Sequence, residues 1–164
     1  MPPPEPSPIE SAGPARLLTV RAATDPQYCQ SEARTFALSL GFAPPRATAL
    51  AIAVSELASN IVRHAREGTV SLRPLASPRE GLEVVAADQG PGIADVGLAL
   101  QDGFSRGRFN AEALDRGEGP APSLGCGLGA VKPLTDECEI DTGPGRGTTV
   151  TVRLWLGNGK GQQR

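Results

Sequence analysis

The sequence predicts an α/β fold: a two-layer α/β sandwich in which a mixed, mostly antiparallel sheet has its helices on one face. A chain of 164 residues has the length of one domain. Two segments in its first half repeat apolar residues with the period of a helix, whereas later apolar segments alternate as strands do. Strands that follow one another closely pair as hairpins, which favours this sandwich over a doubly wound parallel sheet.

The chain begins with a segment that has little to bury. Residues 1–14 have prolines at positions 2, 3, 4, 6, 8 and 14, so we expect a disordered, Pro-rich tail. A strand is predicted over residues 17–22. Asp25 and Pro26 then supply an N-cap and a residue well tolerated at the first helical position, and Gly41 ends this first helix.

The second helix begins at Pro44 and Pro45 and has two distinct faces. Its apolar stripe recurs at intervals of four, three and four residues and consists of Leu50, Val54, Leu57 and Ile61. A polar row with a spacing of four lies on another face and consists of Glu56, Asn60 and His64. The stripe predicts packing against the sheet, whereas a polar row on a largely apolar helix indicates a functional surface.

The middle of the chain predicts a hairpin followed by a glycine-rich turn and a long loop. Residues 70–72 and 81–87 form the hairpin, and Asp88–Ile93 form the turn. Asp95 is placed to cap a short helix that ends at about residue 101. Residues 102–124 have no sustained period, and a connection of this length inside a domain predicts a lid over a ligand site.

The end of the chain predicts the remaining helix and strands of a domain that spans residues 15–156. We expect a glycine-rich turn over 125–129 and a helix from 130 to about 137. Two paired strands over 139–142 and 148–156 and a flexible tail over 157–164 follow. Pro133 lies within this helix, and a proline removes one helical hydrogen bond. The helix is therefore expected to be short or bent.

Composition excludes several classes of partner and site. The formal net charge is -2 and no block of basic residues stands out, so nucleic acid is not the expected partner. No apolar stretch approaches the ~20 residues of a spanning helix, so we expect a cytoplasmic protein with no membrane partner. The cysteines at 29, 126 and 138 have neither zinc-site spacing nor disulfide density and predict reduced thiols.

Several short motifs occur in a fixed order along the chain. They are Glu56–Asn60 on a helix, Asp88–Ile93 at a strand end, Gly125–Gly129 after the predicted lid and Gly145–Thr149 near the end. Alone, each is explained by surface or turn statistics. Together they resemble the ordered signature of the GHKL superfamily of ATPases and kinases, over nearly all of residues 17–155. The residues of these motifs resemble those of the RsbT-type switch kinases, in Ser55–Leu57, Asp88–Ile93, Asp102–Ser105 and Gly127–Lys132.

The resemblance implies ATP and Mg²⁺ as ligands, and the residue chemistry agrees. Mg²⁺ prefers oxygen ligands and keeps most of its waters, so the side-chain carbonyl of Asn60 is a suitable metal ligand. Glu56 stands one helical turn earlier, where it can act as the general base on an attacking hydroxyl. Phosphate charge can also be met by Arg63 or His64, although a lone histidine at a helix end is as often structural.

The same resemblance assigns an adenine site and a phosphate site. Asp88 is expected to accept a hydrogen bond from the exocyclic amine of adenine, with Thr148 completing the contact directly or through water. Gly90 and Gly92 would let the backbone pass close to the base, and Ile93 belongs to the same segment. Phosphate oxygens would be bound by backbone N–H groups at a helix start, those of Gly125, Gly127, Leu128 and Gly129.

The implied activity is that of a protein serine/threonine kinase which transfers the γ-phosphate of Mg-ATP to a STAS-domain antagonist. A metal-dependent serine phosphatase or a sigma factor would be the further partner, in a bacterial stress pathway based on partner switching. One alternative is a nucleotide-binding module that sequesters a sigma factor or regulator without kinase activity. Another is the detached catalytic half of a histidine kinase, against which stands the lack of a phosphoacceptor helix pair. Whether the chain forms a homodimer is left open.

Overall fold

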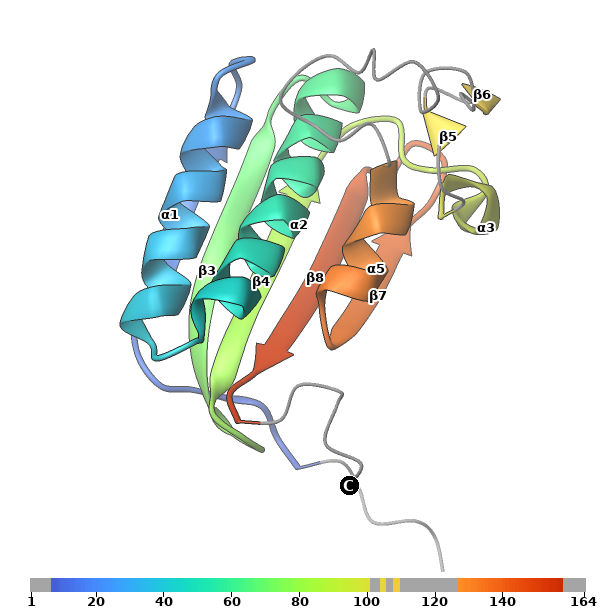
Figure 1. Ribbon diagram of the computed structural model, residues 1–164. Coiled ribbons are helices and arrows are strands. Elements are labelled where there is room, and N and C mark those ends of the chain that lie inside the picture. Colours follow the sequence, from blue (N-terminus) through green and yellow to red (C-terminus); the bar gives the residue numbers. More distant parts are fainter. Residues whose placement is uncertain (1–6, 101–103, 106–107, 110–126, 158–164) are drawn as a thin grey trace, which may run out of the picture.

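A computed structural model describes residues 7–100, 104–105, 108–109 and 127–157. They form two layers, a six-stranded sheet and a layer of helices on one of its faces (Figure 1). The strand order is β1-β3-β4-β8-β7, with β2 also paired to β3. The predicted two-layer α/β sandwich is confirmed, but the sheet is not mixed, because every pairing among the described strands is antiparallel.

The helices are α1 (Asp25–Ser39), α2 (Pro44–His64), α3 (Val96–Ala99), the 3-10 turn η1 (Gly127–Ala130) and α5 (Val131–Leu134). The strands of the main sheet are β1 (Glu10–Ser11), β2 (Arg16–Val20), β3 (Gly68–Ser77), β4 (Gly81–Asp88), β7 (Glu137–Thr142) and β8 (Thr148–Trp155). Two short strands, β5 (Phe104–Ser105) and β6 (Arg108–Phe109), pair separately within the segment predicted as the lid. The rest of that predicted lid lies outside the described residues.

The N-terminal segment departs from the prediction of a disordered tail. Glu10–Ser11 form β1 and pair with the end of β3, while the backbone N–H of Ala12 donates to the carbonyl of Pro74 at 2.8 Å. The prediction is wrong for these residues because the free edge of β3 offers unpaired backbone groups. Pro74 lies opposite the break between β1 and β2, where a residue without a backbone N–H disrupts the fewest hydrogen bonds between strands. The boundaries of the domain otherwise stay a prediction.

Two helix ends also differ from the predictions. Asp25 does not cap α1 but is its first residue, and its Oδ2 accepts the backbone N–H groups of Arg21 and Ala22, both at 2.7 Å. These hydrogen bonds lower the pKa of Asp25. The helix that contains Pro133 ends at Leu134 rather than near residue 137, because the chain turns extended at Thr135 to begin β7. The predicted cap by Asp95 is confirmed, since its Oδ1 accepts the N–H of Leu98 at 2.9 Å.

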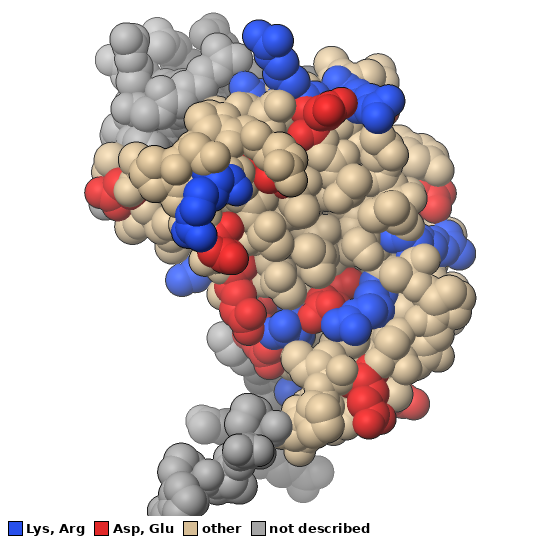
Figure 2. Space-filling model, turned by 180° about the vertical axis from the view of Figure 1, so that it is seen from behind, with Lys and Arg blue, Asp and Glu red and all other residues tan. Residues whose placement is uncertain are grey.

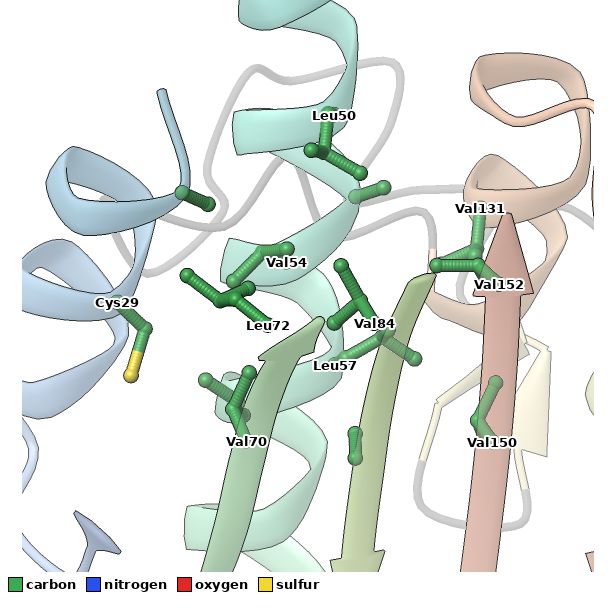
Figure 3. Close-up of a cluster of buried hydrophobic side chains, with 14 of the residues drawn as sticks. Cys29, Leu50, Val54, Leu57, Val70, Leu72, Val84, Val131, Val150 and Val152 are labelled. Atoms are coloured by element: carbon green, nitrogen blue, oxygen red, sulfur yellow. The ribbon is translucent and has the colours of Figure 1, made fainter. Parts of the chain in front are cut away.

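The core lies between the helices and the sheet (Figure 3). The predicted stripe of α2 is confirmed, because none of its residues is more than 2% exposed, and they are Leu50, Val54, Leu57 and Ile61. They pack on strand residues that point to the same side of the sheet, among them Val70, Leu72, Val84 and Val152. Because α2 spans this core, the side chains on its flank are held at fixed positions relative to the strand ends.

None of the helices that the structure describes lies over the other face of the sheet, and charged side chains lie across it (Figure 2). Glu83 is at its centre and only 4% exposed. Its Oε1 accepts from Arg73 Nε at 3.0 Å and Nη2 at 2.6 Å, and its Oε2 accepts from Arg153 Nε at 2.8 Å. Arg153 also donates to Glu137 and Glu139, at 3.1 and 2.8 Å. On this face of the sheet, the network of charged side chains covers the central strands.

The described part of the chain bears on two predictions from composition. No helix within it is both long enough and apolar enough to cross a membrane. Cys29 and Cys138 are free thiols, as predicted, whereas Cys126 lies outside the described residues. Burial, together with the nearby Asp25 carboxylate, raises the pKa of Cys29 to about 11. That thiol therefore stays protonated at neutral pH.

One carboxylate joins the start of α2 to the end of the sheet. Asp136, just before β7, accepts from both terminal nitrogens of the Arg46 guanidinium and from the backbone N–H of Trp155, the last at 2.8 Å. Burial acts to raise the pKa of Asp136. The hydrogen bonds from Arg46 and Trp155 outweigh burial, so the pKa lies below its usual value.

Asp136→Asn is expected to lower the free energy of unfolding by about 1–2 kcal/mol near neutral pH, because a charge-assisted hydrogen bond is lost. The unfolded pKa of an aspartate is about 3.9, and the folded value is lower. The carboxylate therefore stabilises the fold fully above the unfolded pKa, and this contribution is lost as the pH falls toward the folded one. Urea unfolding of both proteins from about pH 7 to about pH 3 measures whether their difference shrinks in acid.

Asp141→Asn is the matched control for this prediction. Asp141 is 86% exposed and its carboxylate lies 3.9 Å from Arg146. An ion pair of this kind contributes little, so no measurable change is expected. A difference between wild type and Asp136→Asn that stays constant into acid would show that Asp136 does not act through its charge.

Candidate functional site

A cavity of about 620 Å³ opens between α2, the ends of β4 and β8, α3 and the turn η1. Its walls are largely apolar, with a few polar groups at the sheet end and on α2. The residues that line it are Leu57, Asn60, Ile61, His64, Ala86, Asp88, Pro91, Gly92, Ile93, Ala94, Asp95, Leu98, Ala99, Gly127, Leu128, Thr148 and Val150. This volume and this balance of apolar walls with few polar groups are typical of small-molecule sites.

The sheet end of the cavity is built by two strands in register. Asp88 ends β4 directly opposite Thr148, which begins β8. Oδ1 of Asp88 accepts the backbone N–H of Gly90 at 2.8 Å and of Thr148 at 3.2 Å. Both bonds use Oδ1, so Oδ2 points to the further hydrogen bond that a ligand could donate. The carboxylate is thus held in one orientation before anything binds.

The glycines of this end are required by contacts within the protein. Gly92 has φ +76°, and a Cβ there would lie 2.0 Å from the carbonyl oxygen of Gly143. Gly147 has φ +74°, and its Cβ would lie 2.1 Å from the carbonyl oxygen of Asp88. A Cβ on Gly90 would meet Ala65 at 2.7 Å. Both glycines therefore permit the turn to pack against neighbouring backbone and helix, and the predicted room for a base at Gly90 and Gly92 stays a prediction.

The α2 wall of the cavity includes part of the predicted polar row. Asn60 and His64 line the cavity together with the apolar Leu57 and Ile61. Glu56 is 1% exposed and is not among the lining residues, although it stands one turn before Asn60 on the same helix. A hydroxyl that uses Glu56 as a base must therefore reach a carboxylate buried beneath this wall.

The structure brings together most of the residues that the sequence predicted. Those that line the cavity are Asn60, His64, Asp88, Gly92, Ile93, Gly127, Leu128 and Thr148. Glu56, Gly90 and Gly129 are described but do not line it, and Gly125 lies outside the described residues. Gly127 and Leu128 are buried in η1, at the start of the helical segment that continues as α5.

Sequence reasoning missed the apolar walls and one hydroxyl. Leu98 and Ala99 of α3 close one side of the cavity, and the short helix gave no sign of this. Thr142, the last residue of β7, lies opposite Thr148 and contacts its hydroxyl at 3.0 Å. The pairing of predicted strands around residues 143–147 was the available signal, because it places Thr142 beside Thr148.

The site fits a planar ligand with a hydrogen-bond donor at one edge. Ala86, Val150, Ile93 and Leu57 supply apolar surface, and the fixed Asp88 carboxylate supplies an acceptor at the inner end. An adenine base has these properties. Within the part of the chain that the structure describes, no group of three or more His, Cys, Asp or Glu could hold a metal ion. With nucleotides, Mg²⁺ takes most of its ligands from phosphates and water, and one protein oxygen such as that of Asn60 is enough to complete such a set.

Known proteins with similar sequences point in the same direction. The family model described as histidine kinase-like ATPase domain matches residues 20–154. The serine/threonine-protein kinase RsbT of Bacillus subtilis (strain 168) is 35% identical over 124 residues, which are 75% of this chain and 83% of that protein. The anti-sigma F factor of Thermoanaerobacter sp. (strain X514) is 28% identical over 111 residues, 66% of this chain and 69% of that one.

A solved structure shows the same fold. It contains the RsbU and RsbW domains of Rv1364c from Mycobacterium tuberculosis, and it aligns with a TM-score of 0.58 and 15% sequence identity. The alignment covers 90% of this chain but 34% of that chain. At this identity the likeness concerns the fold alone.

Proposed function

Because this chain belongs to the family of histidine kinase-like (GHKL) ATPase domains, and within it to the RsbT-type regulatory kinases, we propose that it is a serine/threonine protein kinase. It transfers the γ-phosphate of Mg-ATP to a STAS-domain antagonist protein in a bacterial partner-switching pathway. The phosphorylated antagonist would release the kinase to bind a further partner, either a metal-dependent serine phosphatase or a sigma factor.

One observation supports this proposal above the others: a single cavity is lined by Asn60 on the helix wall and by Asp88 and Thr148 at the sheet end. The first is a side-chain oxygen suited to Mg²⁺, and the others are acceptors suited to an amine. These groups come from segments far apart in the sequence. Their meeting in one cavity is the arrangement that binding of one nucleotide requires.

We assign the following roles to the residues of the site. Asp88 and Thr148 bind the adenine edge, and the apolar walls bury the ring. Asn60 gives its side-chain oxygen to Mg²⁺, and the backbone N–H groups of the glycine segment at 125–129 bind phosphate oxygens. When bound, Mg-ATP supplies the phosphoryl group and a cation that neutralises its charge. His64 contributes a further donor at the cavity rim.

Glu56 is assigned the role of general base, which accepts the proton of the attacking hydroxyl. It stands one turn before Asn60 on α2, so a hydroxyl positioned beside a Mg²⁺ ligand lies within a short distance of this helix segment. Its burial means that the substrate loop must enter the site for the proton to be transferred. Such a requirement would restrict transfer to a protein substrate whose loop fits the site.

The proposal is tested by incubating the protein with γ-labelled ATP, Mg²⁺ and STAS-domain proteins encoded by the same genome. Transfer of label to a serine or threonine of one of them is the expected result. If ATP binds but no label reaches any of these proteins, the proposed kinase activity toward STAS-domain proteins is contradicted.

A second candidate function rests on the similarity to an anti-sigma F factor. In that case the chain would bind a sigma factor or another regulator, and nucleotide would only set its conformation. Co-purification of a sigma factor together with no phosphotransfer would favour this function over the first.

A further inference from the structure

Thr142 lies behind the cavity and joins the segments that form its sheet end. Its Oγ1 accepts the backbone N–H of Ile93 at 2.9 Å, donates to the carbonyl oxygen of Gly147 at 2.9 Å, and lies 3.0 Å from Oγ1 of Thr148. Ile93 and Thr148 line the cavity, whereas Thr142 does not. Any influence of Thr142 on a ligand must therefore act through its neighbours.

The number of protons in this cluster fixes the direction of its hydrogen bonds. A hydroxyl has one proton to donate and lone pairs to accept with. The carbonyl oxygen of Gly147 can only accept, so the proton of Thr142 goes there. The contact between the two threonines must then use the proton of Thr148. With that proton committed, the Thr148 hydroxyl has only lone pairs left for the cavity.

We propose that Thr142 is a positioning residue which holds the Thr148 hydroxyl as an acceptor and so selects 6-amino purines over 6-oxo purines. This inference rests on the proposed function, because it concerns the base of the bound nucleotide. The Thr148 oxygen and Oδ2 of Asp88 then present acceptors at the same end of the cavity. An exocyclic amine has two N–H donors to offer them, whereas a 6-oxo group would place a third acceptor there.

Thr142→Val tests the inference, because valine keeps the branched shape of threonine but removes the hydroxyl. The Thr148 proton then has no acceptor behind it and can turn toward the cavity, where it would favour a 6-oxo base. Calorimetric titration with ATP and with inosine triphosphate, both with Mg²⁺, measures the ratio of the two affinities. The preference for ATP is expected to fall roughly 3- to 10-fold, the effect of one hydrogen bond.

The ratio separates positioning from a merely structural role. Loss of the Ile93 and Gly147 hydrogen bonds can loosen the loop and weaken both nucleotides, but a loosened loop alone would leave their ratio unchanged. Thr142→Ser restores the hydroxyl and should restore the ratio. Thr151→Val is the matched control, because Thr151 is on β8, the strand paired with that of Thr142, with its side chain on the opposite face of the sheet, and it should change nothing. If the valine variant does not fold, Thr142→Ala has the same expected result.

Two outcomes would overturn the inference and are distinguishable. If wild type prefers ATP and the ratio is the same in Thr142→Val, Thr142 does not orient the hydroxyl, while the proposed function stands. If wild type binds neither nucleotide, both the proposed function and this inference are wrong.

Discussion

Replacing Glu56 by glutamine is expected to slow phosphotransfer to the protein substrate by about 10²- to 10⁴-fold, the usual contribution of a general base. Glutamine has the same shape and keeps an amide oxygen, but it cannot take up a proton. Because Glu56 is 1% exposed, an isosteric change is a better test than alanine, which would leave a cavity in a packed helix. The measurement is the single-turnover rate with labelled ATP.

The same variant should leave nucleotide affinity nearly unchanged. Asn60 lines the cavity and Glu56 does not, so a nucleotide bound in the cavity would contact the first and not the second. Calorimetric titration of ATP into wild type and Glu56→Gln is expected to give dissociation constants that agree. A variant that lost binding as much as turnover would show that Glu56 supports the site rather than the chemistry.

Glu83→Gln is the matched control, because Glu83 is also a buried glutamate, 4% exposed, but lies on the face of the sheet away from the cavity. It should lower stability because glutamine lacks the charge and keeps only one of the two oxygens that accept from Arg73 and Arg153, while the turnover rate of the folded protein stays the same. If Glu56→Gln turned over at the wild-type rate, Glu56 would not be the general base.

The fold was predictable because its elements depend on local patterns. The apolar stripe of α2 and the alternation within β8 each specify a buried face, and a two-layer sandwich is the arrangement that covers both. The polar row on α2 was equally visible, since a spacing of four places side chains above one another. Asn60 and His64 reach the cavity for this reason.

What could not be predicted depends on contacts between distant segments. The pairing of Glu10–Ser11 with β3 requires a free strand edge, which only the assembled sheet reveals. Glu56 belongs to the same polar row as Asn60, yet whether each faces ligand or protein depends on what packs over the helix. At the end of α2, Arg66 takes the left-handed conformation, φ 73°, that a glycine usually marks.

The sheet end of the cavity shows the same division between local and long-range information. Asp88 and the glycines around it were recognisable as a motif, but their mutual support was not. The N–H of Thr148 orients Asp88, and Gly147 allows the backbone of Asp88 to approach closely. The orientation of the Asp88 carboxylate thus depends on a residue 60 positions away in the chain. The pairing of the predicted strands could place Thr142 beside Thr148, but the hydrogen bonds of Thr142 to Ile93 and Gly147 depend on the assembled fold.

Asp88→Asn is expected to weaken ATP binding by about 10- to 150-fold, through loss of a charge-assisted hydrogen bond of roughly 1.5–3 kcal/mol. The asparagine oxygen can still accept the N–H groups of Gly90 and Thr148, so the loop should keep its conformation. Its amide nitrogen then replaces Oδ2 and directs a donor at the donor of the adenine amine. Titration calorimetry with Mg-ATP measures the loss, and thermal unfolding checks that the fold is retained.

Asp141→Asn serves as the control, because it makes the same substitution at a carboxylate that is 86% exposed on β7, two strands away in the same sheet. It should bind ATP as wild type does. Asp88→Asn and Glu56→Gln should also differ from each other: the first should raise KM for ATP and the second should lower kcat. Undiminished ATP affinity in Asp88→Asn would mean that adenine is not recognised at this end of the sheet, and the orientation proposed for the whole nucleotide would then be wrong.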